Sequence, residues 1–71
     1  MRSISYDPLW KTLIDRKLSK SEFVKTVGIS KSTLVQLNHN ESVTLDTILR
    51  ICNALDCDLY DVVETKTDDS V

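Results

Sequence analysis

The 71-residue sequence is poor in glycine, proline, histidine and cysteine, and it has no long apolar run. A membrane span needs about 18 consecutive apolar residues, and the chain opens without a charged and then apolar leader, so we expect a cytoplasmic protein. Cys52 and Cys57 fit neither a disulfide-rich scaffold nor a CxxC pair, and His39 is the only histidine. We therefore expect two reduced thiols, no metal site and no cofactor.

The chain is also too short for most catalytic architectures. One small domain fits this length, whereas a substrate pocket closed by a lid does not. The sequence assembles neither a nucleophile beside a base, nor paired carboxylates in a cleft, nor a set of metal ligands, so we do not expect an enzyme. With 41% hydrophobic and 28% charged residues, the composition favours a compact helical domain over a disordered chain.

Charge is unevenly distributed along the chain. Residues 1–40 hold seven Lys and Arg against three Asp and Glu, whereas residues 41–71 hold two against eight. This polarity favours a molecule in which one end meets an anion and the other avoids it. The alternative is that the charges simply cover solvated faces.

Apolar residues followed by capping residues predict the starts of five short helices. The predicted caps are Asp7 before Pro8, Ser19 with Glu22, Ser30, Thr44 and Asp58. The predicted buried positions are Leu9, Trp10, Leu13 and Ile14 in the first helix and Leu45, Ile48, Leu49, Cys52 and Leu55 in the fourth; in the fifth, Leu59, Val62 and Val63 are predicted to be buried or half-buried. We predict a compact all-α bundle of five helices in one domain at residues 1–64, and a flexible polar tail at residues 65–71. Residues 2–6 alternate weakly between polar and apolar side chains, and this segment could pair as a strand at a dimer edge.

Residues 20–39, KSEFVKTVGISKSTLVQLNH, have the pattern of two helices joined by a tight turn. Gly28 is the only glycine, and it lies where the first of these helices must end in a left-handed conformation. The apolar set that would lock the two helices together is Phe23, Val27, Ile29, Leu34 and Leu37. The pattern predicts a helix-turn-helix whose second helix spans residues 31–38.

The sequence resembles the lambda repressor and Cro family of helix-turn-helix proteins, the XRE family, and in particular its short stand-alone bacterial branch. The phrases LSKSEFVKTVGISKSTLVQL and LDTILRICNALDCDLYDVVE carry the resemblance, which covers residues 8–64. It implies a lambda-repressor-like fold and binding of double-stranded DNA. One departure is Val24, which stands where the family usually has alanine, and this implies a wider helix pair or a locally adjusted packing.

The face of helix 31–38 that points away from the core would read DNA bases in the major groove. Lys31 could donate to guanine, Gln36 could pair with adenine, and Ser32 could do either. Val35 is apolar on this face, which a thymine methyl group would explain; the alternative is that single exposed apolar residues are common.

Phosphate contacts would fix the register of the protein on the duplex. The candidates are Lys20, Thr33, Asn38, His39 and Asn40. The helix starts at Ser19 and Ser30 would add backbone N–H groups, and Lys17 and Lys25 would add diffuse attraction.

A single recognition helix reads few base pairs, so we expect a homodimer on a pseudo-palindromic operator. The predicted dimer interface is Leu59, Tyr60 and Val63, although Leu59 and Val63 could instead complete the monomer core. The function expected is that of a transcriptional regulator, a repressor that acts by operator occupancy. The alternative is an antitoxin or interaction module that uses the same fold, and its acidic half, to bind a partner protein.

Overall fold

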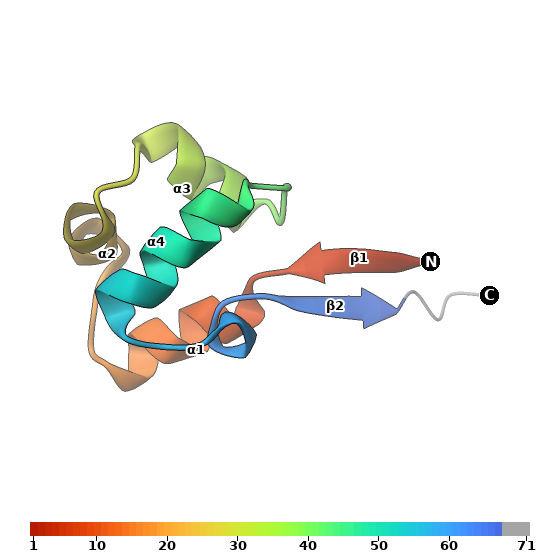
Figure 1. Cartoon of the computed structure of the whole chain (residues 1–71), viewed down its shortest axis with the longest axis horizontal. Helices are drawn as coiled ribbons and strands as arrows, with labels where there is room; N and C mark the ends of the chain where they lie inside the picture. Colours follow the sequence, from red (N-terminus) through yellow and green to blue (C-terminus); the bar gives the residue numbers. More distant parts are fainter. Residues whose placement is uncertain (68–71) are drawn as a thin grey trace.

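The computed structural model describes residues 1–67, which form four α-helices, one 3₁₀ turn and two short strands (Figure 1). The elements in chain order are β1 (Arg2–Ser5), α1 (Asp7–Asp15), α2 (Lys20–Val27), α3 (Lys31–Asn38), α4 (Leu45–Leu55), the 3₁₀ turn η1 (Leu59–Asp61) and β2 (Glu64–Thr67). The four helices gather at one end of the molecule, and the two strands extend from them as a ribbon (Figure 1). Within residues 1–67, no helix has the length and apolar character needed to cross a membrane.

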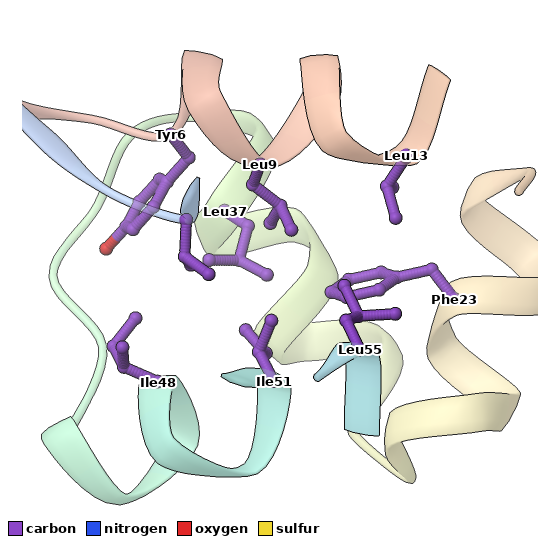
Figure 2. Close-up of a cluster of buried hydrophobic side chains, with 9 residues drawn as sticks. Tyr6, Leu9, Leu13, Phe23, Leu37, Ile48, Ile51 and Leu55 are labelled. Carbon is purple, nitrogen blue, oxygen red and sulfur yellow. The ribbon is translucent and has the colours of Figure 1, made fainter. Parts of the chain in front are cut away.

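The helices enclose one apolar core. Its fully or nearly buried members are Tyr6, Leu9, Leu13, Phe23, Leu37, Ile48, Ile51, Leu55 and Val62. Side chains from α1, α2, α3 and α4 point toward one another in this cluster (Figure 2). Every α-helix therefore contributes to the core, so the orientation of α3 is fixed by the same packing that stabilises the domain.

The prediction of an all-α bundle of five helices is wrong at both ends of the chain. Residues 59–61 form only a single 3₁₀ turn, and β1 pairs antiparallel with β2 in the register Ile4↔Thr65. Residues 65–67, predicted to lie in a flexible tail, are thus part of a strand, and residues 68–71 of that tail lie outside the described residues. The two strands pair with each other within the chain. No local turn joins them, so the sequence carries no hairpin signal.

Most of the predicted helix starts are confirmed. The hydroxyl of Ser19 accepts from the Glu22 N–H at 3.1 Å, and the two residues form a capping box. The hydroxyls of Ser30 and Thr44 cap α3 and α4 by accepting from the N–H three residues on, and Asp58 caps η1. These caps form because a short polar side chain can satisfy backbone N–H groups that have no partner within the helix.

The predicted cap at Asp7 is wrong. Helix α1 begins at Asp7 itself, after Tyr6, and the hydroxyl of buried Ser5 accepts from the Asp7 N–H at 3.2 Å. The Asp7 carboxylate instead forms an ion pair with Lys66 on β2 at 2.6 Å. This pair ties the ribbon to the first turn of α1, a contact between distant residues that local capping rules do not anticipate.

Four predicted core positions are exposed. The exposed fractions are 74% for Ile14, 76% for Leu45, 59% for Leu49 and 42% for Leu59. The buried residues of α4 are Ile48, Ile51 and Leu55. The face of α4 that contacts the core therefore does not include Leu45 and Leu49. Both leucines have helical spacing to core residues, but they lie at the edge of the apolar stripe, and only the position of the neighbouring helices decides which edge is covered.

Candidate nucleic-acid interface

Helices α2 and α3 are joined by the tight turn that the sequence predicted. Gly28 ends α2 in the left-handed region, with φ 80° and ψ 33°, and its N–H donates to the Val24 carbonyl at 2.9 Å. A Cβ at this position would meet no atom within 4 Å. Glycine is therefore favoured here by the backbone conformation and not by lack of space.

The start of α3 is the least negative helix start in the described part of the chain. An acidic residue lies in the first turn of α1, α2, α4 and η1, whereas the first turn of α3 has none and begins with Lys31. Acidic side chains offset the positive end of a helix dipole. The N-terminal end of α3 thus keeps its positive potential and adds the charge of Lys31, a combination that attracts phosphate.

The predicted base-reading face of α3 is exposed. Lys31, Ser32 and Gln36 are accessible to solvent, and the Val35 side chain is 51% exposed. On the opposite side of the helix, Leu37 points into the core (Figure 2). Burial of Leu37 fixes which side of α3 faces outward; the base contacts of the four exposed residues stay a prediction.

Val35 forms part of a shallow apolar groove between α2 and α3. Val24, Leu34 and Val35 supply its apolar lining, and Ser21, Lys25 and Lys31 complete it. Val24 is the residue that departs from the usual alanine, and here it is half-buried beside the core. The apolar surface of the groove is therefore bordered by two cationic side chains on the face that presents the start of α3.

Lys20 is held in place by two other elements. Its ammonium group donates to the side-chain oxygen of Asn38 at 2.6 Å and lies 4.3 Å from the centre of the Trp10 ring. The Trp10 ring in turn packs edge-on against Phe23, with ring centres 6.5 Å apart. Lys20 and Asn38, both predicted to contact phosphate, are thus brought together at one place on the surface, and a cation–π contact orients the lysine. Sequence reasoning missed Trp10 because no local pattern relates it to Lys20.

Asn40 has a role inside the fold. It adopts φ 55°, and its side-chain oxygen accepts from the Tyr6 N–H at 3.2 Å. The Tyr6 hydroxyl donates to the Glu41 carbonyl at 2.6 Å, and burial raises the pKa of this phenol, so it stays a protonated donor. These bonds attach the end of α3 to the start of α1. Asparagine tolerates the left-handed conformation, which is a local signal that the phosphate interpretation of Asn40 overlooked.

The remaining phosphate candidates differ in accessibility. Thr33 is half-buried, and its hydroxyl lies 3.1 Å from that of Ser30 at the cap of α3. His39 is exposed at the end of α3, where its backbone N–H donates to the Val35 and Gln36 carbonyls. Phosphate contacts by either residue stay predictions.

A family model for the Cro/C1-type HTH DNA-binding domain matches residues 8–68. The chain belongs to this Cro/C1-type helix-turn-helix family. YozG of Bacillus subtilis (strain 168), an uncharacterized HTH-type transcriptional regulator, is 34% identical over 59 residues, which cover 80% of this chain and 70% of YozG. The crystal structure of the transcriptional regulator VanUg shares 45% sequence identity and a TM-score of 0.89, and the match covers 94% of this chain and 89% of VanUg.

These matches confirm the family predicted from the sequence. They support DNA binding and transcription regulation as the function of this Cro/C1-type protein. Family and fold are those of DNA-binding regulators, a class that is typically not enzymatic. The helix-turn-helix of the family is formed here by α2, Gly28 and α3.

The Cro/C1-type domain also has an apolar surface formed by α4 and η1. Leu45, Leu49 and Leu59 line a groove there, and Tyr60, which is 82% exposed, adjoins it through a second groove that Leu59 shares. Of the three residues predicted at the dimer interface, Leu59 and Tyr60 are exposed, and Val63 is half-buried against the core. Val63 therefore supports the core of the domain, whereas Leu59 and Tyr60 remain accessible. The dimer interface stays a prediction.

Proposed function

We propose that this protein represses transcription as a dimer, by occupying an operator whose two half-sites are each read by one α3. The observation that carries the proposal is the start of α3, which lacks an acidic residue in its first turn and presents exposed Lys31, Ser32 and Gln36. Such a helix end attracts the phosphate backbone, and its side chains have the donors and acceptors that read base edges.

The proposal is tested by selecting bound duplexes from a randomised DNA pool. Wild type is compared with a Lys31→Ala, Gln36→Ala double variant and with a Lys11→Ala, Asn53→Ala control, which removes the same kinds of exposed side chain from α1 and α4. Wild type and control should enrich the same inverted repeat, and the α3 variant should lose or change it. Enrichment of one identical motif by all three proteins would show that these α3 side chains do not read the bases.

We further propose that the α4 and η1 surface is where two copies meet. It combines the predicted residues Leu59 and Tyr60 with Leu45 and Leu49, which the fold leaves exposed. Apolar surface of this kind is common at subunit interfaces. Contact through it would give the two-fold symmetry that a palindromic operator requires.

Sedimentation over a range of protein concentrations tests this interface. Leu49→Glu should shift the chain toward the monomer, because a carboxylate would be buried in an apolar contact. Ile14→Glu is the matched control, since Ile14 is an exposed apolar residue on α1, outside the groove. A wild type that stays monomeric, or an equal effect of both variants, would contradict the proposed interface.

The alternative of an antitoxin or partner-binding module uses the same apolar surface. It is supported by the acidic second part of the chain, which would attract a basic partner. If the DNA selection enriches no sequence and the remaining DNA binding disappears at moderate salt, this alternative replaces the repressor proposal.

A further inference from the structure

Helix α4 ends in a hydrogen-bond pattern that brings two cysteines together. The Cys57 N–H donates to the Cys52 carbonyl at 3.0 Å, and Asp56 between them adopts the left-handed φ of 50°. This bond from the sixth residue back to the first, with a left-handed residue before it, is the Schellman ending of a helix. The side chains at its two ends, here the two thiols, commonly contact each other.

The end of α1 shows the same pattern with different side chains. The Leu18 N–H donates to the Leu13 carbonyl at 2.9 Å, again with a left-handed residue before the donor. In α1 the paired positions hold two leucines that belong to the core or pack against it. In α4 the equivalent positions hold Cys52 and Cys57, which are free thiols and only partly buried.

The backbone bond limits the separation of the two cysteines. With standard bond lengths, an N···O distance of 3.0 Å places the Cα atoms of Cys52 and Cys57 no more than about 7 Å apart. Cysteines that form disulfides have Cα atoms up to about 7 Å apart. Both residues also line the surface groove between α4 and η1, so a small oxidant can approach them from solvent.

We propose that Cys52 and Cys57 are a redox site, in which a low-molecular-weight disulfide such as oxidised glutathione converts the two thiols into a reversible intramolecular disulfide without unfolding the domain. The inference is independent of the DNA-binding proposal.

The reaction is a pair of thiol–disulfide exchanges. One cysteine, as its thiolate, attacks a sulfur of oxidised glutathione, forms a mixed disulfide and releases one glutathione. The second cysteine then loses its proton, attacks the protein sulfur of the mixed disulfide and releases the other glutathione. The two protein sulfurs together lose two electrons, and the glutathione disulfide gains them.

The surroundings of Cys57 shift the pH dependence of the exchange toward higher pH. Burial raises the pKa of the Cys57 thiol, nearby Cys52 and Asp61 raise it further, and Arg16 acts in the opposite direction. A raised pKa means that little thiolate is present at neutral pH, and the thiolate is the attacking form. The rate of disulfide formation should therefore increase as the pH is raised above neutral.

The test measures the thiol–disulfide equilibrium of the full chain with glutathione, once in native buffer and once in concentrated urea. If the fold holds the two sulfurs close enough to bond, the equilibrium constant for the internal disulfide should be at least tenfold larger in native buffer than in urea. Each tenfold difference between the two equilibrium constants means that the oxidised chain is more stable to unfolding than the reduced chain by about 1.4 kcal/mol. An equal or smaller constant in native buffer would overturn the proposal.

Mass spectrometry of the native reaction separates the products. Wild type should lose two hydrogens and stay a single chain, whereas Cys52→Ser and Cys57→Ser should each carry one glutathione. Two glutathiones on wild type, or disulfides between chains in place of the internal one, would also overturn the proposal. The comparison of native buffer with urea uses wild type alone, so it does not depend on the folding of the variants.

Discussion

Four residues in the described part of the chain adopt a left-handed backbone, and only one of them is glycine. The residues are Lys17, Gly28, Asn40 and Asp56, with φ between 50° and 80°. Glycine adopts this conformation without steric cost, and asparagine tolerates it. Lys17 has neither advantage, and its conformation is imposed by the Schellman ending of α1, in which Leu18 returns to Leu13. The packing of Leu18 against the core therefore offsets the backbone strain at Lys17.

Lys17→Gly should raise the free energy of unfolding by about 1 kcal/mol, because glycine removes the strain of the left-handed conformation. Urea denaturation measures the change. Gly28→Ala is the comparison in the opposite direction and should lower stability by a similar amount, although its Cβ would have open space around it. A Lys17→Gly protein less stable than wild type would show that the lysine side chain contributes more than its backbone costs.

Val35 is expected to contact a thymine methyl group from the groove that it forms with Val24 and Leu34. Replacing thymine by uracil removes only that methyl group. At the contacted position of a selected operator, wild-type affinity should fall about fourfold, as expected for loss of one buried methyl. Val35→Ala should bind the two duplexes equally. Band-shift titration of duplexes with each thymine replaced in turn measures this, and equal losses for wild type and variant at every position would rule out the contact.

At the level of elements, the helix starts depend on contacts within a few residues, whereas the ribbon depends on contacts between distant parts of the chain. Each of α2, α3 and α4 is capped by a hydroxyl from the residue just before it. The ribbon, in contrast, joins residues about sixty positions apart and is stabilised by the Lys66–Asp7 ion pair and a bond from Arg2 to Thr65. A two-stranded ribbon is marginal by itself, so these side-chain contacts and the packing of Ile4 on the core hold it to the helices.

The ion pair predicts how stability depends on pH. The hydrogen bond and charge of Lys66 hold the pKa of Asp7 below its ordinary value of 3.8, so the pair stabilises the fold fully above that pH. The contribution is lost as the pH falls through the lower, folded-state pKa. Lys66→Ala should therefore be less stable than wild type at neutral pH, and this difference should disappear in acid.

Thermal unfolding at several pH values measures the loss. Lys25→Ala serves as the control for removing an exposed lysine, and high salt should reduce the effect of Lys66→Ala at neutral pH because both partners are exposed. A difference between wild type and Lys66→Ala that is constant from neutral pH into acid would contradict an electrostatic origin.

At the scale of the whole molecule, the basic part of the chain includes the helix-turn-helix, and the acidic part includes α4, η1 and β2. A net charge of −2 therefore does not oppose DNA binding, because Lys20, Lys25 and Lys31 are exposed on α2 and α3. Separation of charge along the chain allows the helix-turn-helix to attract phosphate although the net charge of the chain is negative.

Salt dependence tests this separation. Each phosphate neutralised by a lysine adds about one to the slope of log affinity against log salt. Lys20→Ala should reduce the slope for a random duplex by about one, because Asn38 and Trp10 hold its ammonium group at the surface. Lys11→Ala on α1 should leave the slope unchanged. Equal slopes for wild type and Lys20→Ala would show that Lys20 does not contact a phosphate.

The candidate site could be predicted from the sequence in its main features because its determinants are local. Ser30 caps α3, Gly28 ends α2, and the burial of Leu37 decides which side of α3 faces outward. The bond of Asn40 to Tyr6 and the contact of Trp10 with Lys20 could not be predicted, since each joins residues of different elements. Local spacing carries no information about such partners.

The sequence by itself determined the four helices, the caps of α2, α3 and α4, and the family, because hydrophobic periodicity, capping side chains and a single glycine act within a few residues. Only the tertiary structure decided the pairing of β1 with β2, the ion pair at Asp7 and the exposure of Leu49. These features depend on which distant elements meet in space. The choice between neighbouring edges of an apolar stripe, or between a tail and a strand, is made by packing that no short segment specifies.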